Sequence, residues 1–245
     1  MTVALRAVWR LLHCVAHLLD GLAIVVFRFG GLDSAQRHRR VGLWSARMLR
    51  VMGIGIEVEG TLQPGGVLLA ANHVSWLDIT ALHAVVPHAR FVSKSDIRSW
   101  PLLSLLADAA GTLYLERERK RDALRVVHLV AQALREGQTV AVFPEGTTSD
   151  GRALLPFHAN LFQAAIATHA MVQPVALRFS DARGPISPAA EFIGTTTLVE
   201  SLWRVACAQG LVAHIALLPA RSAAQADRRA LARTLRDDIA ARLGV

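Results

Sequence analysis

The chain has 245 residues and a formal net charge of +8, from 27 lysine and arginine residues against 19 aspartate and glutamate residues. Hydrophobic residues make up 53% of it, which is above the usual share for a soluble domain. This length allows one large core or at most two small domains. A basic and apolar chain favours an anionic lipid surface or an anionic substrate as its partner, ahead of nucleic acid.

The first 29 residues are largely apolar but carry a narrow stripe of polar side chains. These side chains recur at spacings of four and three residues: Arg6, Arg10, His13, His17 and Asp20. That spacing places them on one face of a helix whose other faces are apolar. The pattern predicts a helix that lies in the membrane interface. It disfavours a free transmembrane span, because Asp20 alone would cost roughly 2.5–3.5 kcal/mol at the bilayer centre.

A basic segment follows this helix at residues 36–40 (QRHRR) and continues with Arg47 and Arg50. Each positive charge near anionic lipid contributes on the order of 1 kcal/mol to membrane binding. Residues 1–53 are therefore predicted to form an N-terminal, membrane-associated helical hairpin. An alternative stays open, in which the two helices are an ordinary amphipathic pair docked on the protein's own core.

After residue 54, short β-rich runs alternate with helical patterns. The predicted strands are Ile54–Glu59, Val67–Ala71, Arg90–Ser93, Thr112–Leu115, Thr139–Phe143, Val172–Phe179 and Leu211–Leu218. The predicted helices cover residues 76–86, 101–108, 119–136, 156–169 and 221–243. Such alternation predicts an α/β domain over residues 54–245, with a central, mostly parallel sheet flanked by helices.

In sheets of this kind ligand-binding residues gather at the carboxyl ends of the strands. The second predicted strand is followed by Asn72, His73 and, five residues after the histidine, Asp78. One interpretation is structural: Ser75 caps a helix that begins at Trp76, and Asp78 completes a capping box. The other is functional: the Asp78 carboxylate accepts a ring N–H of His73 and leaves the second nitrogen free as a base.

Two more strand ends carry polar residues. Residues 143–149 (FPEGTTS) place Glu145, a glycine and three hydroxyls after an apolar strand. Such groups offer hydrogen bonds to a polyol and backbone amides to a phosphate, although a Pro-Glu-Gly turn is also ordinary turn chemistry. After the strand at 112–115, Arg117 can hold a phosphate through its planar guanidinium, or belong to a solvated helix start.

Together these segments resemble the lysophospholipid acyltransferase family, which includes the glycerol-3-phosphate and 1-acylglycerol-3-phosphate acyltransferases. The matching positions, in the family's order, are Asn72, His73 and Asp78; Gly111, Tyr114, Leu115 and Arg117; Phe143 through Thr147; and the apolar stretch Val172–Leu177 around Pro174. Lys94 stands where the family often has a lysine before the second of these blocks. The resemblance spans about residues 55–180.

The resemblance implies direct transfer of an acyl group from acyl-CoA or acyl-carrier protein to the free hydroxyl of a lysophospholipid, with 1-acylglycerol-3-phosphate preferred. It implies His73 as general base and Asp78 as the residue that orients it. Acceptor binding is assigned to six residues: Asn72, Lys94, Arg117, Glu145, Gly146 and Thr147. Because a thioester is already activated, no cofactor and no metal are expected, and the sequence has no His-Glu-x-x-His motif or cysteine cluster.

The implied partners are a membrane lysophospholipid, an acyl thioester and an anionic membrane surface, without nucleic acid. The implied location is the cytoplasmic face of the cell (inner) membrane, with peripheral or monotopic attachment. One position departs from the family: many members have arginine after Glu-Gly-Thr, where this chain has Thr148. The acceptor is then either 1-acylglycerol-3-phosphate held by Arg117 and Lys94, or another lyso-lipid, such as lyso-ornithine lipid.

Two other classes of function stay open. A His/Asp pair can also activate water, which would make the protein a membrane-bound lipid hydrolase, although no Gly-x-Ser-x-Gly motif supplies a serine nucleophile. A non-enzymatic lipid- or nucleic-acid-binding protein would use the positive charge but not the His/Asp pair.

Overall fold

The computed structural model describes residues 2–94, 100–115 and 120–245, without the side chains of residues 94, 115 and 120–124. Its strands are β1 (Ile54–Glu59), β2 (Val67–Ala71), β3 (Arg90–Lys94), β4 (Leu113–Leu115), β5 (Val140–Val142), β6 (Met171–Ser180), β7 (Leu211–Leu217) and β8 (Arg221–Ser222). Its helices are α1 (Val3–Phe27), α2 (Ser34–Met52), α3 (Leu77–Val85), α4 (Pro101–Ala109), α5 (Lys120–Arg135), α6 (Gln163–Thr168), α7 (Leu198–Cys207) and α8 (Arg228–Leu243), with two 3₁₀ turns, η1 (Phe29–Gly31) and η3 (Ala159–Phe162).

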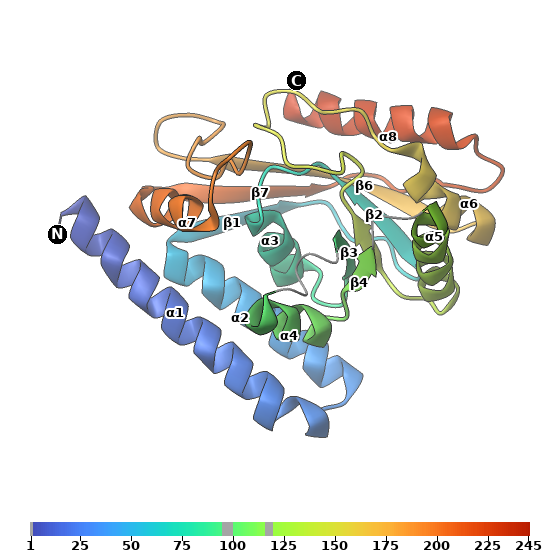
Figure 1. Cartoon of the computed structure of the whole chain (residues 1–245). Coiled ribbons are helices and arrows are strands. Elements are labelled where there is room, and N and C mark those ends of the chain that lie inside the picture. Colours follow the sequence, from blue (N-terminus) through green and yellow to red (C-terminus); the bar gives the residue numbers. More distant parts are fainter. Residues whose placement is uncertain (1, 95–99, 116–119) are drawn as a thin grey trace.

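The strands form one sheet in the order β1-β7-β6-β2-β5-β3-β4, and β8 pairs with β6 (Figure 1). All neighbours in this order are parallel except β6 and β7, which are antiparallel, as are β6 and β8. The prediction of a central, mostly parallel sheet flanked by helices is confirmed. Consequently β2, β5 and β6 all end at the same edge of the sheet, and the loops after them lie together there.

The central strand β2 is buried on both faces, as a near-continuous apolar run predicts. Its odd-numbered residues pack into a core with α2, α3 and α7, and Leu68 and Ala70 pack into a second core with α5, α6 and α8. In Figure 1, α8 lies on one side of the sheet, and α1 and α2 lie on the other. The first core therefore supports α3, which carries Asp78 in its first turn.

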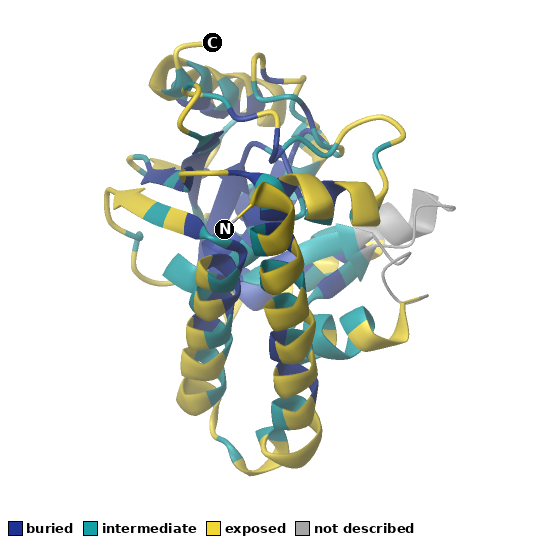
Figure 2. Cartoon of the chain, turned by 90° about the vertical axis from the view of Figure 1, so that its left-hand side faces the viewer, coloured by how far each residue is buried: buried dark blue, intermediate teal, exposed yellow. Residues whose placement is uncertain are grey.

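The N-terminal helices form the predicted hairpin, and Figure 2 shows them side by side with exposed residues along their outer faces. The polar stripe of α1 turns partly toward the protein: Arg10 donates to the carbonyls of Ala206 and Ala208 at 3.0 and 2.8 Å, and His17 is buried against Trp44. The opposite face of α1 leaves large apolar side chains exposed: Leu5, Val8, Trp9, Leu12, Val15, Leu19, Val26 and Phe27.

The hairpin combines features expected from both interpretations. It docks on the α/β domain, because Met48, Leu49 and Met52 of α2 belong to the first core. It also presents an apolar face outward, which a helix pair docked on a core alone would not do. α1 is long and apolar enough to cross a membrane by length and composition, and 17% of its most apolar 18-residue window is buried.

Three differences from the predicted elements have local causes. The helix predicted over 221–243 begins only at Arg228, because Asp227 caps it and residues 221–222 pair with β6 instead. The pattern at 156–169 divides into η3 and α6. Helix α7 was not predicted, although Thr197 with Glu200 three residues later is an N-terminal capping pattern.

Candidate active site

His73 and Asp78 meet at the carboxyl end of β2. The Nδ1 atom of His73 lies 2.8 Å from Oδ2 of Asp78, whose side chain is completely buried. The same oxygen accepts the backbone amides of Val74 at 2.7 Å and Ser75 at 2.9 Å. An ionised carboxylate can only accept, so this contact assigns the proton of a neutral His73 to Nδ1 and leaves the lone pair on Nε2.

The capping box predicted for Ser75 and Asp78 is only half formed: Oδ2 of Asp78 accepts the Ser75 amide at 2.9 Å, but the Ser75 hydroxyl caps no amide in the described part of the chain. Helix α3 begins at Leu77, and its N-cap residue Trp76 makes no side-chain cap. The Ser75 hydroxyl is buried and has no hydrogen-bond partner among the described residues. Asp78 accepts the amide of Val74 as well as that of Ser75, which holds the histidine loop against the first turn of the helix.

The imidazole of His73 stacks on the ring of Phe143, with the centroids 4.0 Å apart and the planes 13° apart. Phe91 stacks in turn on Phe143, and the buried His83 meets Phe91 edge-on. This contact leaves the His73 side chain 17% exposed and fixes the plane of its ring. The sequence motif contained Phe143, but it gave no sign that the ring supports the histidine.

Glu145 joins the loop after β5 to the loop after β2. Its Oε1 accepts the amide of His73 at 2.8 Å, and its Oε2 accepts the amide of Leu155 at 3.0 Å. The amide of Ser149 donates to the His73 carbonyl at 2.8 Å, which closes the connection from the other side. Burial raises the pKa of the Glu145 carboxyl, and the two amide hydrogen bonds partly oppose that shift. Glu145 therefore binds the backbone of the histidine loop through one oxygen and the backbone at Leu155 through the other.

Asn72 is likewise bound to the protein. Its side-chain amide donates to the carbonyl of Leu177 at 2.9 Å, and its oxygen accepts the amide of Leu177 at 2.7 Å. The residue is completely buried. Asn72 thus fastens the end of β2 to β6, one residue before the histidine, and its polar atoms are used by the backbone.

Other residues predicted to bind the acceptor lie beside these loops. Gly146 has a φ of 72°, which favours glycine, and Thr147 is exposed. Thr148, at the position where the family often has arginine, donates its hydroxyl to the carbonyl of Phe192. The amide of Phe192 donates to the Val74 carbonyl at 3.2 Å. Thr148 therefore helps to hold a segment from beyond β6 against the histidine loop.

Two cationic residues, Lys94 and Arg117, were predicted to bind the acceptor. Arg117 lies outside the described residues, and of Lys94 only the backbone is described, as the last residue of β3. Lys94 pairs with Leu115, the last residue of β4, in the parallel register of β3 and β4. In the described part of the chain, no group of three or more His, Cys, Asp or Glu side chains is arranged to hold a metal.

Comparison with known proteins gives consistent matches. Residues 55–178 match the family model "Acyltransferase". The chain is 38% identical to the 1-acyl-sn-glycerol-3-phosphate acyltransferase of Neisseria meningitidis serogroup B, over 90% of this chain and 89% of the relative. It is 36% identical to the lyso-ornithine lipid O-acyltransferase of Pseudomonas aeruginosa, over 84% of this chain and 79% of the relative.

The fold has a counterpart among solved structures. The 1-acyl-sn-glycerophosphate (LPA) acyltransferase PlsC from Thermotoga maritima superposes with a TM-score of 0.75 at 17% identity, covering 98% of this chain and 94% of that one. The family-model match includes His73, Asp78 and Glu145, the residues that the sheet edge brings together. With relatives above 35% identity along most of its length, the chain belongs to the acyltransferase family.

Proposed function

We propose that this acyltransferase moves a fatty acyl group from acyl-CoA or acyl-carrier protein to the free hydroxyl of a lysophospholipid, with 1-acylglycerol-3-phosphate as acceptor and phosphatidic acid as product. The observation that carries the mechanism is the 2.8 Å contact between Nδ1 of His73 and the buried Asp78 carboxylate. It supplies an oriented, neutral base at the surface of the sheet edge, and an acyl thioester supplies an activated carbonyl.

In the reaction, Nε2 of His73 takes the proton of the acceptor hydroxyl as the oxygen attacks the thioester carbonyl. The imidazolium that forms is stabilised by Asp78 and by the Phe143 ring against which it lies. The tetrahedral intermediate expels the thiolate, which receives the proton from His73. One C–S bond breaks, one C–O bond forms, and the histidine returns to its starting state, so no covalent enzyme intermediate is needed.

The residues divide into two roles in this proposal. Asn72 and Glu145 position the histidine loop, because their polar atoms bind backbone groups and both side chains are buried. Gly146, Thr147, Lys94 and Arg117 remain the proposed acceptor-binding residues. Neither a metal nor an organic cofactor has a step in this mechanism.

A second acceptor, lyso-ornithine lipid, is supported by one observation. Thr148 replaces the arginine that is common in the family and uses its hydroxyl to bind Phe192. Position 148 therefore offers no cation to a phosphate. Relatives with 36–38% identity include enzymes named for each acceptor, so the two acceptors need a direct comparison.

We also propose monotopic attachment to the cytoplasmic face of the inner membrane through the hairpin. The outer face of α1 is apolar, and the exposed face of α2 carries Arg39, Arg40, Arg47 and Arg50. This arrangement fits a helix in the acyl region beside cations at the level of the headgroups. The contacts of Arg10 and His17 with the rest of the protein support lying in the interface over crossing the bilayer.

The test uses purified full-length protein, its His73→Ala variant and anionic vesicles. Thioester consumption is measured with 1-acylglycerol-3-phosphate, lyso-ornithine lipid or no acceptor, and products are separated by chromatography. We expect acceptor-dependent acyl transfer that falls by at least about 10²-fold in the variant, while vesicle binding persists. Free fatty acid released without an acceptor would instead identify a hydrolase, and full transfer in His73→Ala would refute the mechanism.

A further inference from the structure

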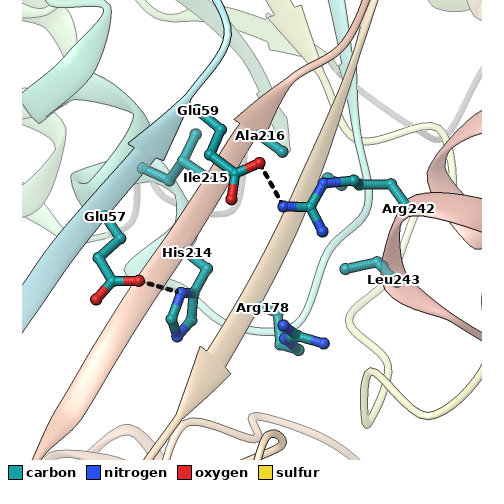
Figure 3. A pocket seen from close by; sticks show the side chains of 9 residues that line it. Glu57, Glu59, Arg178, His214, Ile215, Ala216, Arg242 and Leu243 are labelled. Carbon is teal, nitrogen blue, oxygen red and sulfur yellow. Dashed lines mark hydrogen bonds and ion pairs between the residues drawn. The ribbon is translucent and has the colours of Figure 1, made fainter.

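A cavity lies on the face of the sheet that α8 covers, away from the catalytic histidine. Its polar lining consists of Glu57 and Glu59 from β1, His214 from β7, Arg178 from β6 and Arg242 from α8 (Figure 3). The cavity has a volume of about 60 Å³ and opens to solvent on the side of Glu57 and Glu59, so a ligand can extend out of it. None of these five residues has a role in the acyl transfer proposed above. We call this space the Arg178 cavity.

Each of the two glutamates makes an ion pair or hydrogen bond through one of its two carboxylate oxygens. Oε2 of Glu57 lies 2.9 Å from Nδ1 of His214, whose other nitrogen lies 2.7 Å from the Ser180 hydroxyl. Oε2 of Glu59 accepts a hydrogen bond from Arg242 at 2.6 Å. Both carboxylates are well exposed, at 68% and 69%. A carboxylate has about four acceptor positions on two oxygens, so each glutamate keeps capacity for a further donor.

Arg178 is the cation of this cavity that has no counter-ion. It stands directly opposite His214 in the antiparallel register of β6 and β7, on the same face of the sheet. Its Nε is buried and has no hydrogen-bond partner among the described residues, and none of the ion pairs found there includes it. A buried N–H without an acceptor is costly. A guanidinium in this state is a ready site for a carboxylate or a phosphate.

The surrounding charges decide between those two anions. The charges of the two arginines and the two glutamates in the lining cancel, which disfavours a doubly charged phosphate. The charges are also separated. The glutamates lie on β1 and Arg178 lies on β6, with β7 between these strands. Two strand spacings separate the backbones of β1 and β6 by roughly 10 Å. A ligand with a negative and a positive end matches this arrangement better than a simple anion does.

We propose that the Arg178 cavity binds a zwitterion that carries a carboxylate and, several bonds away, an ammonium group. The carboxylate pairs with Arg178, and the ammonium lies between the free oxygens of Glu57 and Glu59. An ornithine acylated on its α-amino group has this pattern of charges, as has a free amino acid with a basic side chain. The occupant is a soluble amino acid, because the cavity lies across the sheet from the hairpin that is proposed to face the membrane.

Binding to this cavity is independent of the acyl transfer chemistry. His73 lies on the other side of the sheet, against α3, so its loss leaves the cavity unchanged. Equilibrium dialysis of the full chain in detergent, in the His73→Ala background, uses three radiolabelled probes. Nα-acetyl-L-ornithine carries both charges, N-acetyl-L-norvaline lacks the ammonium, and N-acetylputrescine lacks the carboxylate. We expect the first probe to bind at least about tenfold more tightly than either of the others, because each of the others lacks one of the two charged groups that form hydrogen bonds in the cavity.

Three variants assign the contacts. Arg178→Gln should weaken Nα-acetyl-L-ornithine binding at least about tenfold, whereas Arg183→Gln, an exposed arginine in the turn after β6, should not change it. The double variant Glu57→Gln, Glu59→Gln should weaken only probes with an ammonium. Equal binding of the three probes, or wild-type binding by Arg178→Gln, would overturn the proposal. If a variant fails to fold, the comparison of the three probes on the parent protein still tests the proposal.

A kinetic comparison then separates this cavity from the acceptor site. We expect Arg178→Gln in the active enzyme to leave KM unchanged for both lyso-ornithine lipid and 1-acylglycerol-3-phosphate, while dialysis shows the loss of amino-acid binding. A KM raised for lyso-ornithine lipid alone would overturn the assignment of the cavity to a soluble amino acid. Failure of acyl transfer itself would appear in the wild-type assay, and the dialysis result does not depend on it.

Discussion

At the scale of single residues, Asp78 does two things with one oxygen atom. Oδ2 meets the imidazole of His73 and also accepts two amides of the loop that carries it. The first contact sets the tautomer of the histidine, and the second sets the position of its backbone. A change at Asp78 therefore alters both the proton on the ring and the place of the ring.

Asp78→Asn separates charge from geometry, because an asparagine oxygen in the place of Oδ2 can still accept the two amides and the Nδ1 proton of His73, but it carries no negative charge to stabilise the imidazolium. We expect kcat to fall by about 10²–10⁴-fold, with the KM values of both substrates nearly unchanged. Steady-state kinetics on folded protein, checked by circular dichroism, measures this. A variant with more than a tenth of wild-type kcat would show that Asp78 is only a loop anchor.

The buried His83 predicts a pH dependence of stability. Burial lowers its pKa from 6.5 to about 4, and its Nε2 lies 3.1 Å from the Ala89 carbonyl. Between these two pH values the unfolded chain binds a proton that the folded protein excludes, so stability is lost as pH falls from about 6.5 to about 4. The loss is on the order of 3 kcal/mol.

His83→Gln keeps a donor for the carbonyl and cannot titrate. Thermal unfolding of wild type and variant between pH 7 and pH 4.5 should show a smaller decline in the variant. Parallel declines would mean that another group causes the acid sensitivity.

At the scale of elements, helix α1 is fixed to α7 and to the turn after α2 by one side chain. Arg10 donates to two carbonyls at the carboxyl end of α7, and it lies against Gly53, whose φ is 76°. A cation is favourable at that end of a helix. Arg10 thus binds the inner face of α1 to the α/β domain, while the apolar face of α1 stays outward.

Arg10→Ala should loosen α1, because each hydrogen bond from a charged group contributes roughly 1.5–3 kcal/mol. We expect unfolding stability to fall by about 2 kcal/mol and the connection at 28–33 to be cleaved faster in limited proteolysis. Arg204→Ala, which removes an exposed pair on α7, is the matched control and should lose less than about 1 kcal/mol. Equal losses of stability in the two variants would show that Arg10 does not attach α1 to α7.

At the scale of the whole molecule, exposed arginines lie on two opposite sides. Arg39, Arg40 and Arg47 are on α2, and Arg228, Arg229 and Arg233 are on α8, across the sheet (Figure 1). If the hairpin faces the membrane, changing the first three to glutamine weakens binding to anionic vesicles by about 1 kcal/mol per charge, and added salt weakens it further.

The α8 triple variant changes the net charge equally and should bind like wild type. Sedimentation with anionic and with zwitterionic vesicles measures both variants. Equal losses in the two would show that binding follows net charge alone.

The sequence was sufficient for the seven longer strands and for the His73–Asp78 pair, because buried strands have continuous apolar runs and strand-end motifs keep a fixed spacing. It missed the exposed two-residue strand β8. It was not sufficient for the partners of Glu145, since a motif does not tell whether a carboxylate faces a substrate or a backbone amide. The same holds for α1: the spacing of its polar stripe predicted one face, but only packing against α7 and Trp44 decides where that face points. The Arg178 cavity combines three strands and a helix distant in sequence, and no local pattern encodes it.

The hydrogen bonds between Asn72 and Leu177 join residues 105 positions apart. During synthesis the hairpin is complete at Met52, whereas the histidine loop has no anchor on β6 until Leu177 is made, roughly 125 residues later. At roughly 5–20 residues per second this delay is about 6–25 s. If the hairpin faces the membrane and His73 is the base, as proposed above, the nascent chain has time to reach a membrane before its histidine loop is anchored, and targeting then precedes catalysis.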